Sequence, residues 1–444
     1  MITSLRFRRW SAVLGLGLAM GSACGGSDGD AQGSGGQASS GGKAQGGSAS
    51  GGQVSASGGA PLGTGGGTSG STSVGGASAQ GGATARGGSS QGGTTTMGGV
   101  SGAGQSAAGA GADAGGAAGA GGAPEEPLLL GCETVTFEDA ILEAKVRAAL
   151  GVPTGPIDGR VARTLTSFAV FSAGVQKVTG LQCFTGLTTL KLNAEQVKDI
   201  TPLGKLVNVT HLDVFNNQIT DLTPVSGMTG LSVLQIGGNP VTSLAPLANL
   251  PHLEILFAYD NAYPSIAPLA NLVTLKQLYL MNAGITDISP LAKLKLLEKL
   301  QLMGNPFTDF SLLPTFTNLT ELSFSDTTFS DLSALSGLTK LTRLTIINSK
   351  IVDASPVMNF PLLVELQLGG NQIVDISAVS GLTQLNALVL RSNKITSLAA
   401  LVANTGLSQG DDVDIWQNPI DCTAQASNLS ALRARGVNLT TDCP

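Results

Sequence analysis

Residues 187–252 read LTTLKLNAEQVKDITPLGKLVN, VTHLDVFNNQITDLTPVSGMTG and LSVLQIGGNPVTSLAPLANLPH, which are three 22-residue phrases in one register. The phrase continues without slippage to Asn404, so ten consecutive copies start 22 residues apart. A fixed period of this length is typical of a solenoid, in which each copy forms one coil and neighbouring coils stack. The copies start at Leu187, Val209, Leu231, Leu253, Leu275, Leu297, Leu319, Leu341, Leu363 and Leu385.

Each offset within the phrase, counted from its first residue, has a physical role. Apolar residues at offsets three and five, such as Leu190 and Leu192, alternate with their neighbours and predict a short strand. An asparagine at offset eight, such as Asn217, can hydrogen-bond backbone groups where the chain turns. A proline at offset fifteen, such as Pro202, favours a short 3₁₀ turn on the return path. One coil cannot bury so many apolar residues alone, so we expect stacked coils whose strands pair as a parallel sheet.

This pattern resembles the leucine-rich repeats, and in particular the 22-residue bacterial class found in internalin-type surface proteins. The resemblance covers the chain from about residue 127 to the end and implies an α/β solenoid. In such a horseshoe a parallel β-sheet lines the concave face and 3₁₀ turns line the convex face, between a helical N-terminal cap and a disulfide-closed C-terminal cap. Four repeats lack the asparagine, and we expect looser coils there in an unchanged register. The replacements are Glu195, Ala283, Thr327 and Ser349.

The start of the chain has the features of an export signal. A basic beginning and an apolar run that ends at Met20 predict a signal peptide over residues 1–23, because the run is too short to span a bilayer. The following Cys24 resembles the lipidated residue of a bacterial lipoprotein. Gly21 stands where such leaders usually carry leucine, so ordinary signal-peptidase cleavage after Ala23 is the alternative.

Residues 24–126 consist mainly of Gly, Ser, Ala, Thr and Gln. Such a segment cannot bury enough apolar surface to offset its ordering entropy, so we expect a disordered tether. A Gly-rich coil of this length has a mean reach of roughly 55 Å.

Both ends of the repeat array have candidate caps. In the N-terminal cap, residues 127–164, helical apolar spacing predicts a helix over 137–150. The repeats then occupy 165–422, with Leu165 starting an eleventh unit and an insertion delaying the last strand by three residues. The C-terminal cap, residues 423–444, contains a predicted helix from Ala424 to Arg435.

The remaining four cysteines lie in pairs at the two ends of the array. An exported chain with one lipidated cysteine and two disulfides is consistent with the cysteine count. We therefore expect Cys132–Cys183 to pin the N-terminal cap to the first coil and Cys422–Cys443 to close the other end.

The composition argues against several classes of function. With 12% charged residues and a net charge of −6, the chain lacks the basic surface that nucleic-acid binding needs. The sequence shows no catalytic constellation, metal-ligand spacing or cofactor motif, and it contains only two histidines. Asp411, Asp412 and Asp414 could hold a cation weakly, but a solvated loop is the better interpretation. We expect a non-enzymatic protein without cofactor or metal.

The candidate binding site lies on the concave face, where side chains at offsets two, four and six point. Aromatic and methionine residues gather there over several neighbouring coils, and contiguous surface of this kind usually marks a binding site. The alternatives are that the rings merely cover the sheet or support self-association. The candidate contact residues are Phe215, Phe257, Tyr259, Tyr279, Met281 and Met303. Further along, offset two carries alternating charges that predict a self-neutralised cross-strand ladder of Lys299, Glu321, Arg343 and Glu365.

The sequence therefore predicts a protein that is secreted across the inner membrane and lipid-anchored at the cell envelope, at the outer membrane by analogy. Its concave face binds a protein, with a glycan as the less favoured ligand. The alternative is a structural protein that self-associates in the envelope. Repeats of this kind are scaffolds, so the fold does not identify the ligand.

Overall fold

The computed structural model describes residues 127–444. The predicted signal peptide (1–23), the lipidated Cys24 and the tether (24–126) lie outside these described residues. A sheet of 13 strands runs in sequence order from β3 (Ser167–Phe171) to β15 (Asn438–Thr440). Between them lie β4 (Thr189–Asn193), β5 (His211–Asp213), β6 (Val233–Gln235), β7 (Ile255–Phe257), β8 (Gln277–Tyr279), β9 (Lys299–Gln301), β10 (Glu321–Ser325), β11 (Arg343–Ile347), β12 (Glu365–Gln367), β13 (Ala387–Val389) and β14 (Asp412–Asp414).

Each strand from β3 to β13 is followed by a corner and then by a short helix on the return path. Most of these helices are 3₁₀ turns with a proline in their first turn, as expected from a residue that fixes φ. They are η1 (Leu181–Cys183), η2 (Thr201–Lys205), η3 (Thr223–Gly227), η4 (Ala245–Leu247), η5 (Ala267–Asn271), η6 (Ser289–Lys293), η7 (Leu313–Thr315), η8 (Leu332–Leu335), η9 (Ser355–Asn359), η10 (Ser377–Gly381) and the α-helix α4 (Ala399–Ala403).

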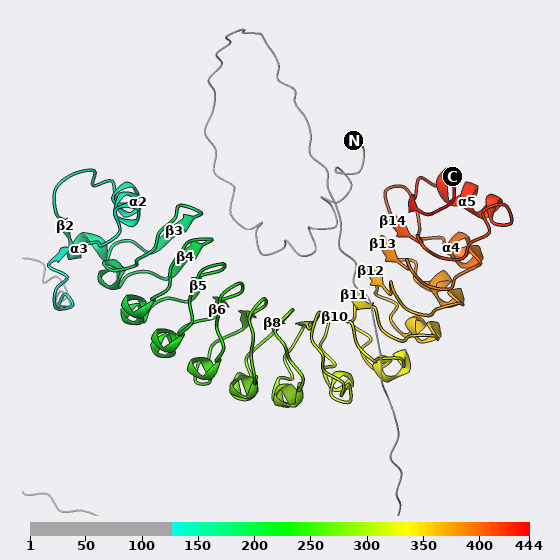
Figure 1. Cartoon of the computed structure of the whole chain (residues 1–444), viewed down its shortest axis with the longest axis horizontal. Coiled ribbons are helices and arrows are strands. Elements are labelled where there is room, and N and C mark those ends of the chain that lie inside the picture. The colour runs from blue at the N-terminus through cyan, green and yellow to red at the C-terminus, as the bar shows by residue number, and fades with distance from the viewer. Residues whose placement is uncertain (1–126) are drawn as a thin grey trace, which may run out of the picture. The chain divides into compact units, whose positions relative to one another are not determined.

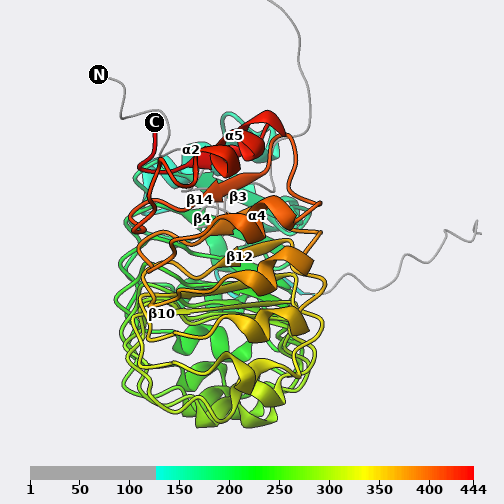
Figure 2. The same cartoon turned by 90° about the vertical axis from the view of Figure 1, so that its right-hand side faces the viewer.

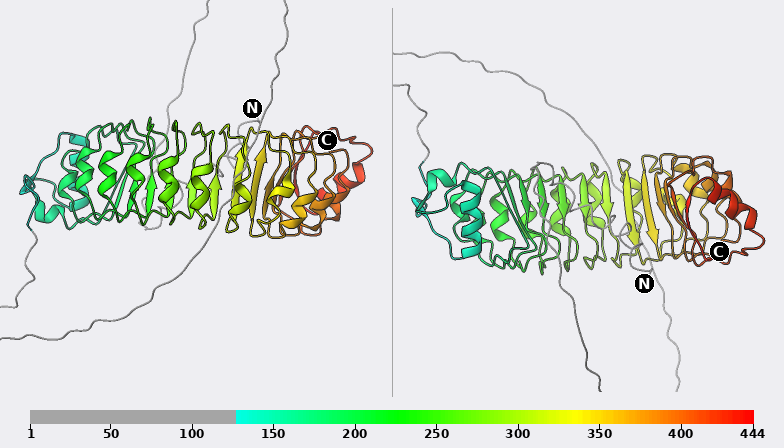
Figure 3. Two further views of the ribbon diagram at one scale, coloured as in Figure 1. Left: turned by 90° about the horizontal axis from the view of Figure 1, so that it is seen from below. Right: turned by 90° about the horizontal axis from the view of Figure 1, so that it is seen from above.

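The coils stack into an arc with the strands on its inner side and the helical turns on its outer side (Figure 1). After a turn of 90° the coils overlap one below another beneath α5 (Figure 2), and the views from below and above show the coils in a single row (Figure 3). The predicted leucine-rich-repeat horseshoe is confirmed.

The period of 22 residues sets the strand register. Leu190, Leu212 and Leu234 are cross-strand partners on neighbouring strands, and each is at most 1% exposed. At the predicted insertion Ala387 pairs with Asp412, so the delay of three residues is absorbed outside the sheet. Every coil thus buries the same offsets in one continuous core.

The offset-eight asparagines hydrogen-bond backbone groups at the turn, as predicted, and they also join neighbouring coils, which the sequence analysis did not predict. Asn217 Oδ1 accepts from Val197 N (3.0 Å), while its Nδ2 donates to the carbonyl oxygens of Leu192 (2.7 Å) and Val214 (3.0 Å). One buried side-chain amide thus provides hydrogen-bond partners for three backbone groups that would otherwise be buried without any, at a cost in stability. The same bonds recur at Asn239, Asn305, Asn371 and Asn393.

Three of the four coils that lack the asparagine are also held by polar contacts. The Glu195 carboxylate accepts from the backbone N–H groups of Ala173, Gly174 and Val175 at 2.7–3.1 Å. In the middle of the array the buried hydroxyls of Thr327 and Ser349 bond to each other at 2.9 Å. The hydrogen bonds at these positions therefore give no reason to expect looser coils where the asparagine is missing.

The corner after each strand is made by a residue in the left-handed conformation at offset seven. All nine non-glycine residues with positive φ in the described chain occupy this offset, and glycine fills it in the remaining coils. Its backbone N–H continues the sheet; Asn216 N, for example, donates to Gly237 O at 2.9 Å. Asn and Asp tolerate this region better than bulkier residues do. The non-glycine residues are Ser172, Ala194, Asn216, Asp260, Asn282, Asp326, Asn348, Ser392 and Gln417.

The N-terminal cap contains the predicted helix, α2 (Ala140–Leu150), which starts three residues later than expected because Asp139 is its N-cap. Asp139 Oδ1 accepts from Ile141 N and Leu142 N at 3.0 Å, and its Oδ2 accepts from Gln176 N (2.8 Å) of the first coil. The Cys132–Cys183 disulfide is confirmed. Sequence reasoning missed the antiparallel pair β1 (Thr134–Val135) and β2 (Ile157–Asp158) and the short helix α3 (Gly159–Ala162).

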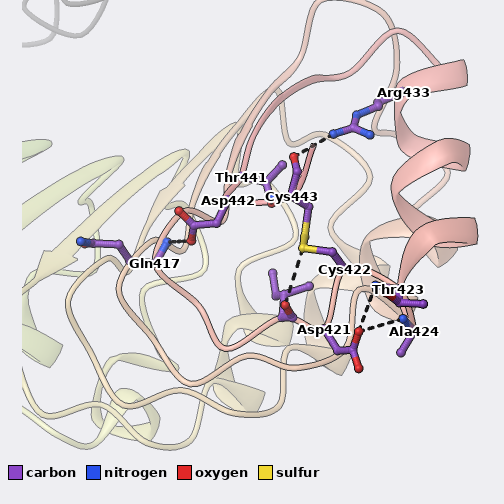
Figure 4. Close-up of a disulfide and its surroundings, with 10 residues drawn as sticks. Gln417, Asp421, Cys422, Thr423, Ala424, Arg433, Thr441, Asp442 and Cys443 are labelled. Atoms are coloured by element: carbon purple, nitrogen blue, oxygen red, sulfur yellow. Dashed lines mark hydrogen bonds between the residues drawn. A yellow bond between two sulfur atoms is a disulfide. The ribbon is translucent and has the colours of Figure 1, made fainter.

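The C-terminal cap consists of α5 (Ala426–Ala434) and the unpredicted strand β15, which pairs with β14. The predicted Cys422–Cys443 disulfide joins the two ends of this cap (Figure 4). Arg433 Nη2 donates to Cys443 O (3.2 Å), so α5 and the chain terminus are also linked by a hydrogen bond. Across residues 127–444, no helix has the length and apolarity needed to cross a bilayer.

Candidate functional site

The concave sheet carries all six residues that the sequence singled out, and each is partly exposed. Phe257 and Tyr279 are the last residues of β7 and β8. The other four lie two residues beyond the ends of their strands, at offset six. Because neighbouring strands are about 4.8 Å apart, these positions form adjoining columns on one face. The four residues are Phe215, Tyr259, Met281 and Met303.

The first ring pair spans three coils. The Phe215 and Tyr259 ring centroids are 5.7 Å apart at an interplanar angle of 49°. The coil between them contributes Gly237, where a Cβ atom would stand 3.0 Å from carbons of the Tyr259 ring. The glycine thus leaves room for the tyrosine to reach back toward Phe215. Burial raises the pKa of Tyr259, whose hydroxyl accepts from Gln235 Nε2 at 3.2 Å.

The second ring pair is stacked. Phe257 and Tyr279 are cross-strand partners whose centroids are 4.4 Å apart at 17°. The Tyr279 hydroxyl donates to Gln277 Oε1 (3.2 Å), and burial raises its pKa to about 12. The hydroxyl therefore stays neutral near pH 7 and offers a hydrogen bond beside an apolar platform.

The structure does not merge all six residues into one ring cluster. Among residues 127–444, no aromatic contact joins the two ring pairs. Met281 and Met303 extend the offset-six column on the next two coils. Much of each ring covers its neighbour, so the surface offered to a ligand is smaller than the sequence suggested.

The predicted charge ladder is confirmed on the adjoining coils. Lys299 Nζ and Arg343 Nη1 lie 2.8 and 3.0 Å from Glu321 Oε1, and Arg343 Nε lies 3.4 Å from Glu365 Oε2. The four charges cancel, so this part of the sheet offers little net field to a partner. The side chains of Glu321 and Glu365 are only 12% and 13% exposed, so these pairs are partly buried and are screened less than pairs on an open surface.

Two exposed aromatic residues were missed. Phe171 is 56% exposed and Trp416 is 44% exposed. They occupy offset six of the first and last coils, so extending the offset rule to both ends of the array would have found them.

A group of polar side chains beside the first ring pair was also missed. Asn193, Asp213 and Gln235 lie on β4, β5 and β6, and we call them the acceptor cluster. Gln235 is only 6% exposed, and burial raises the pKa of Asp213. Periodicity cannot reveal such a group, because each residue occupies an ordinary outward-facing offset.

Other parts of the described chain are less suited to ligands. Within residues 127–444, no group of three or more His, Cys, Asp or Glu side chains is placed to hold a metal ion. In the inserted loop Asp411 accepts from Ser408 N (2.7 Å) and Asp412 from Asn438 Nδ2 (3.0 Å), while Asp414 is turned to Trp416 N (3.0 Å). These carboxylates thus serve separate backbone and side-chain donors.

Comparisons with known proteins agree with this architecture. Residues 177–227 match the family model of leucine-rich repeats (2 copies). The chain has no match among curated protein sequences.

Solved structures provide more extensive matches. The chain is 29% identical to an internalin, InlF, from Listeria monocytogenes, over 69% of this chain and 96% of that one, with a TM-score of 0.60. A leucine-rich-repeat protein from Leptospira interrogans is 21% identical over 59% of this chain and 74% of its own, with a TM-score of 0.51. The chain is therefore internalin-like in its repeat architecture, which is that of a protein–protein interaction module.

Proposed function

We propose that this internalin-like leucine-rich-repeat protein is a non-enzymatic recognition module of the cell envelope. Its concave face binds a protein partner, with a glycan as the less favoured ligand. Cys24 carries a lipid anchor, and residues 24–126 tether the solenoid at the outer membrane or cell surface.

The observation that carries the proposal is the pair of aromatic contacts on the concave sheet. Phe215–Tyr259 and Phe257–Tyr279 are supported on four neighbouring coils whose backbone is fixed by buried asparagines and a continuous core. Rigid aromatic side chains lose little conformational entropy on binding, which is why they are frequent at the energetic centres of interfaces.

The proposed location rests on the sequence of residues 1–126 alone. An export signal followed by a lipidated cysteine and a Gly-rich tether would present the solenoid outside the inner membrane. The non-enzymatic assignment rests on the similarity to internalin-type proteins, which are generally binding modules.

The test compares capture by purified wild-type protein and by a variant with Phe257, Tyr259 and Tyr279 changed to Ser. Each protein is immobilised and exposed to intact cells and envelope extracts. We expect the wild type to retain a partner that the triple variant loses. Because these rings are half-buried, a second variant, Ile255→Lys, places a charge in the patch and leaves every ring in position.

A matched control changes three exposed apolar residues off the concave sheet, Val352, Met358 and Val374, to Ser. This control should capture the partner as the wild type does. Equal capture by the wild type and by both patch variants would refute the proposed site. Concentration-dependent dimerisation that disappears in the triple variant would instead favour the self-associating envelope protein.

A further inference from the structure

Asp213 is a half-buried carboxylate on the concave face, and Lys191 is its cross-strand partner on β4. It closes β5, and its oxygens accept from Asn193 Nδ2 (2.8 Å) and Phe215 N (3.2 Å). Among the ion pairs of residues 127–444, none involves Asp213. Burial disfavours the ionised form and raises the pKa of Asp213, and the nearby charge of Lys191 offsets only part of this rise.

Two buried oxygens next to this carboxylate lack donors. Gln235 is the cross-strand partner of Asp213, and its Oε1 is buried without a hydrogen bond. The same holds for Asn193 Oδ1 on the other side. A buried acceptor without a donor destabilises the protein, so such a group in a native protein is usually satisfied by a ligand or by water. Together the acceptor cluster offers a carboxylate and two amide oxygens over three neighbouring strands.

An aromatic wall stands beside these acceptors. Phe215 follows Asp213 by two residues, and Tyr259 packs against Phe215. Gln235 Nε2 donates to the Tyr259 hydroxyl, which links the wall to the acceptor cluster. A cation that approached the carboxylate would therefore also meet an aromatic ring, which attracts cations to its face.

The opposite end of the same sheet contains an equivalent arrangement that includes its own cation. Asp414 accepts from Trp416 N (3.0 Å) just as Asp213 accepts from Phe215 N. The preceding coil places Arg391 at the offset that Asn193 occupies beside Asp213. Burial raises the pKa of Asp414, and the charge of Arg391 lowers it. Both carboxylates thus have a nearby cation, Lys191 at the N-terminal site and Arg391 at the C-terminal one, and the N-terminal site differs in carrying an amide, Asn193, at offset six.

We propose that the acceptor cluster and Phe215 receive an arginine side chain of the protein partner. The guanidinium donates to the Asp213 carboxylate with its plane against the ring, and the side chains of Asn193 and Gln235 turn toward it so that their buried oxygens gain donors. Arginine fits better than lysine because its five donors spread over a planar fork, whereas an ammonium offers three donors around one point. This inference rests on the proposed function and names the chemistry that the concave face selects.

The proposal makes binding dependent on pH. The charged and titratable groups around Asp213 are Lys191 on the preceding strand, His211 on the same strand, and Tyr259 and Asp260 two coils further on. Arginine binding needs the ionised Asp213. Since burial raises its pKa above the usual range near 4, binding weakens as the pH falls through that raised value. In Asp213→Asn this dependence disappears, while any contribution of His211 remains.

The test uses two probes with the purified protein, the pentapeptide acetyl-Gly-Gly-Arg-Gly-Gly-amide and the same peptide with citrulline, which keeps the shape but removes the charge. Binding is followed by the NMR shifts of the side-chain amides. We expect the arginine peptide to shift Asn193 and Gln235 and to bind at least about tenfold more tightly than the citrulline peptide. Asp213→Asn should lose the same factor, whereas the matched variant Asp414→Asn should bind like the wild type.

Equal binding of both peptides, or unchanged binding by Asp213→Asn, would overturn the arginine assignment. If an N-acetylglucosamine tetramer shifts the NMR signals of these side-chain amides and the arginine peptide does not, the arginine assignment is also overturned, and a glycan is the favoured ligand. The proposed function fails separately: it is refuted when the aromatic patch variants capture the cellular partner as the wild type does. If the cellular partner needs the aromatic patch but binds Asp213→Asn as it binds the wild type, the proposed function stands and only the arginine assignment is refuted.

Discussion

Tyr263 illustrates how far a single residue can depart from the repeat without disturbing it. It occupies offset ten, which elsewhere carries Ile, Val or Phe, and it is 3% exposed. Small residues stand at two nearby repeat positions, Ala258 at offset five and Ala283 at offset eight. Tyr263 N donates to Ala283 O at 3.0 Å in place of the missing asparagine side chain. Its own hydroxyl is buried without a hydrogen-bond partner, and burial raises its pKa.

Removing this hydroxyl should stabilise the protein. We expect Tyr263→Phe to raise the free energy of unfolding by about 1–2 kcal/mol, because a buried unsatisfied group is eliminated while the ring remains. Urea unfolding at neutral pH measures the change. The matched variant Tyr279→Phe removes a hydroxyl that donates to Gln277 and should bring no gain. A loss of stability in Tyr263→Phe would show that the hydroxyl has a partner in solution.

At the scale of the coil, the residue types at the offset-seven corner repeat every three coils, which is a longer period than the 22-residue repeat itself. Asn282 Nδ2 donates to Asp260 Oδ1 (2.8 Å), and a Cβ atom at Gly304 on the next coil would stand 2.1 Å from Asn282 Oδ1. Three coils later the same order recurs with Asp326, Asn348 and Gly370, again with 2.1 Å at the glycine. An asparagine at offset seven whose side chain donates to the preceding coil thus requires glycine at offset seven of the following coil.

This dependence predicts that substitution by alanine destabilises the protein to different extents at two glycines with nearly the same φ. Gly304 has φ +70° and Gly284 has φ +69°, but nothing lies within 4 Å of a Cβ atom at Gly284. Either Ala substitution should cost about 1–2 kcal/mol for the left-handed conformation. Gly304→Ala should cost about 1 kcal/mol more, because Asn282 must turn away from Asp260. Thermal unfolding of both variants checks the difference, and equal losses would show that the cross-coil bond adds nothing.

At the scale of the whole molecule, the coils form a linear array in which each contacts its neighbours. Such arrays are expected to tolerate the loss of complete repeats, because stability is a sum of coil and interface contributions. Because the residues at offset seven repeat every three coils, deletion of three complete coils should be tolerated best. Such a deletion leaves every asparagine at offset seven followed by a glycine at offset seven of the next coil.

Deletion of residues 297–362 should therefore give a shorter solenoid that still unfolds cooperatively. The deletion joins Leu296 to Leu363 and brings Gly370 after Asn282, as Gly304 stands now. Hydrogen exchange should show protected strand amides on both sides of the junction. Deletion of 297–360 removes almost the same number of residues but breaks the register, and it should leave one side unprotected. Equal protection in both deletions would contradict a register set by the 22-residue period.

The sequence by itself determined the architecture, because the architecture repeats. Residues that recur every 22 positions must occupy equivalent places on stacked coils, so Leu190 and Leu212 had to be buried and Phe257 had to face outward. The asparagine bonds and the two disulfides followed from the same placement. The N-terminal pair β1–β2 and the last strand β15 lie outside the repeat, and their short segments carry no pattern that could have predicted them.

Only the tertiary structure decided which outward-facing residues act together. An offset fixes the face and the column of a side chain but not how far it reaches across coils. Tyr259 meets Phe215 because the intervening residue is Gly237, and Asp213 accepts from an amide because the preceding coil places Asn193 beside it. These properties depend on the side chains of two neighbouring coils at once, which the period of a single coil does not specify.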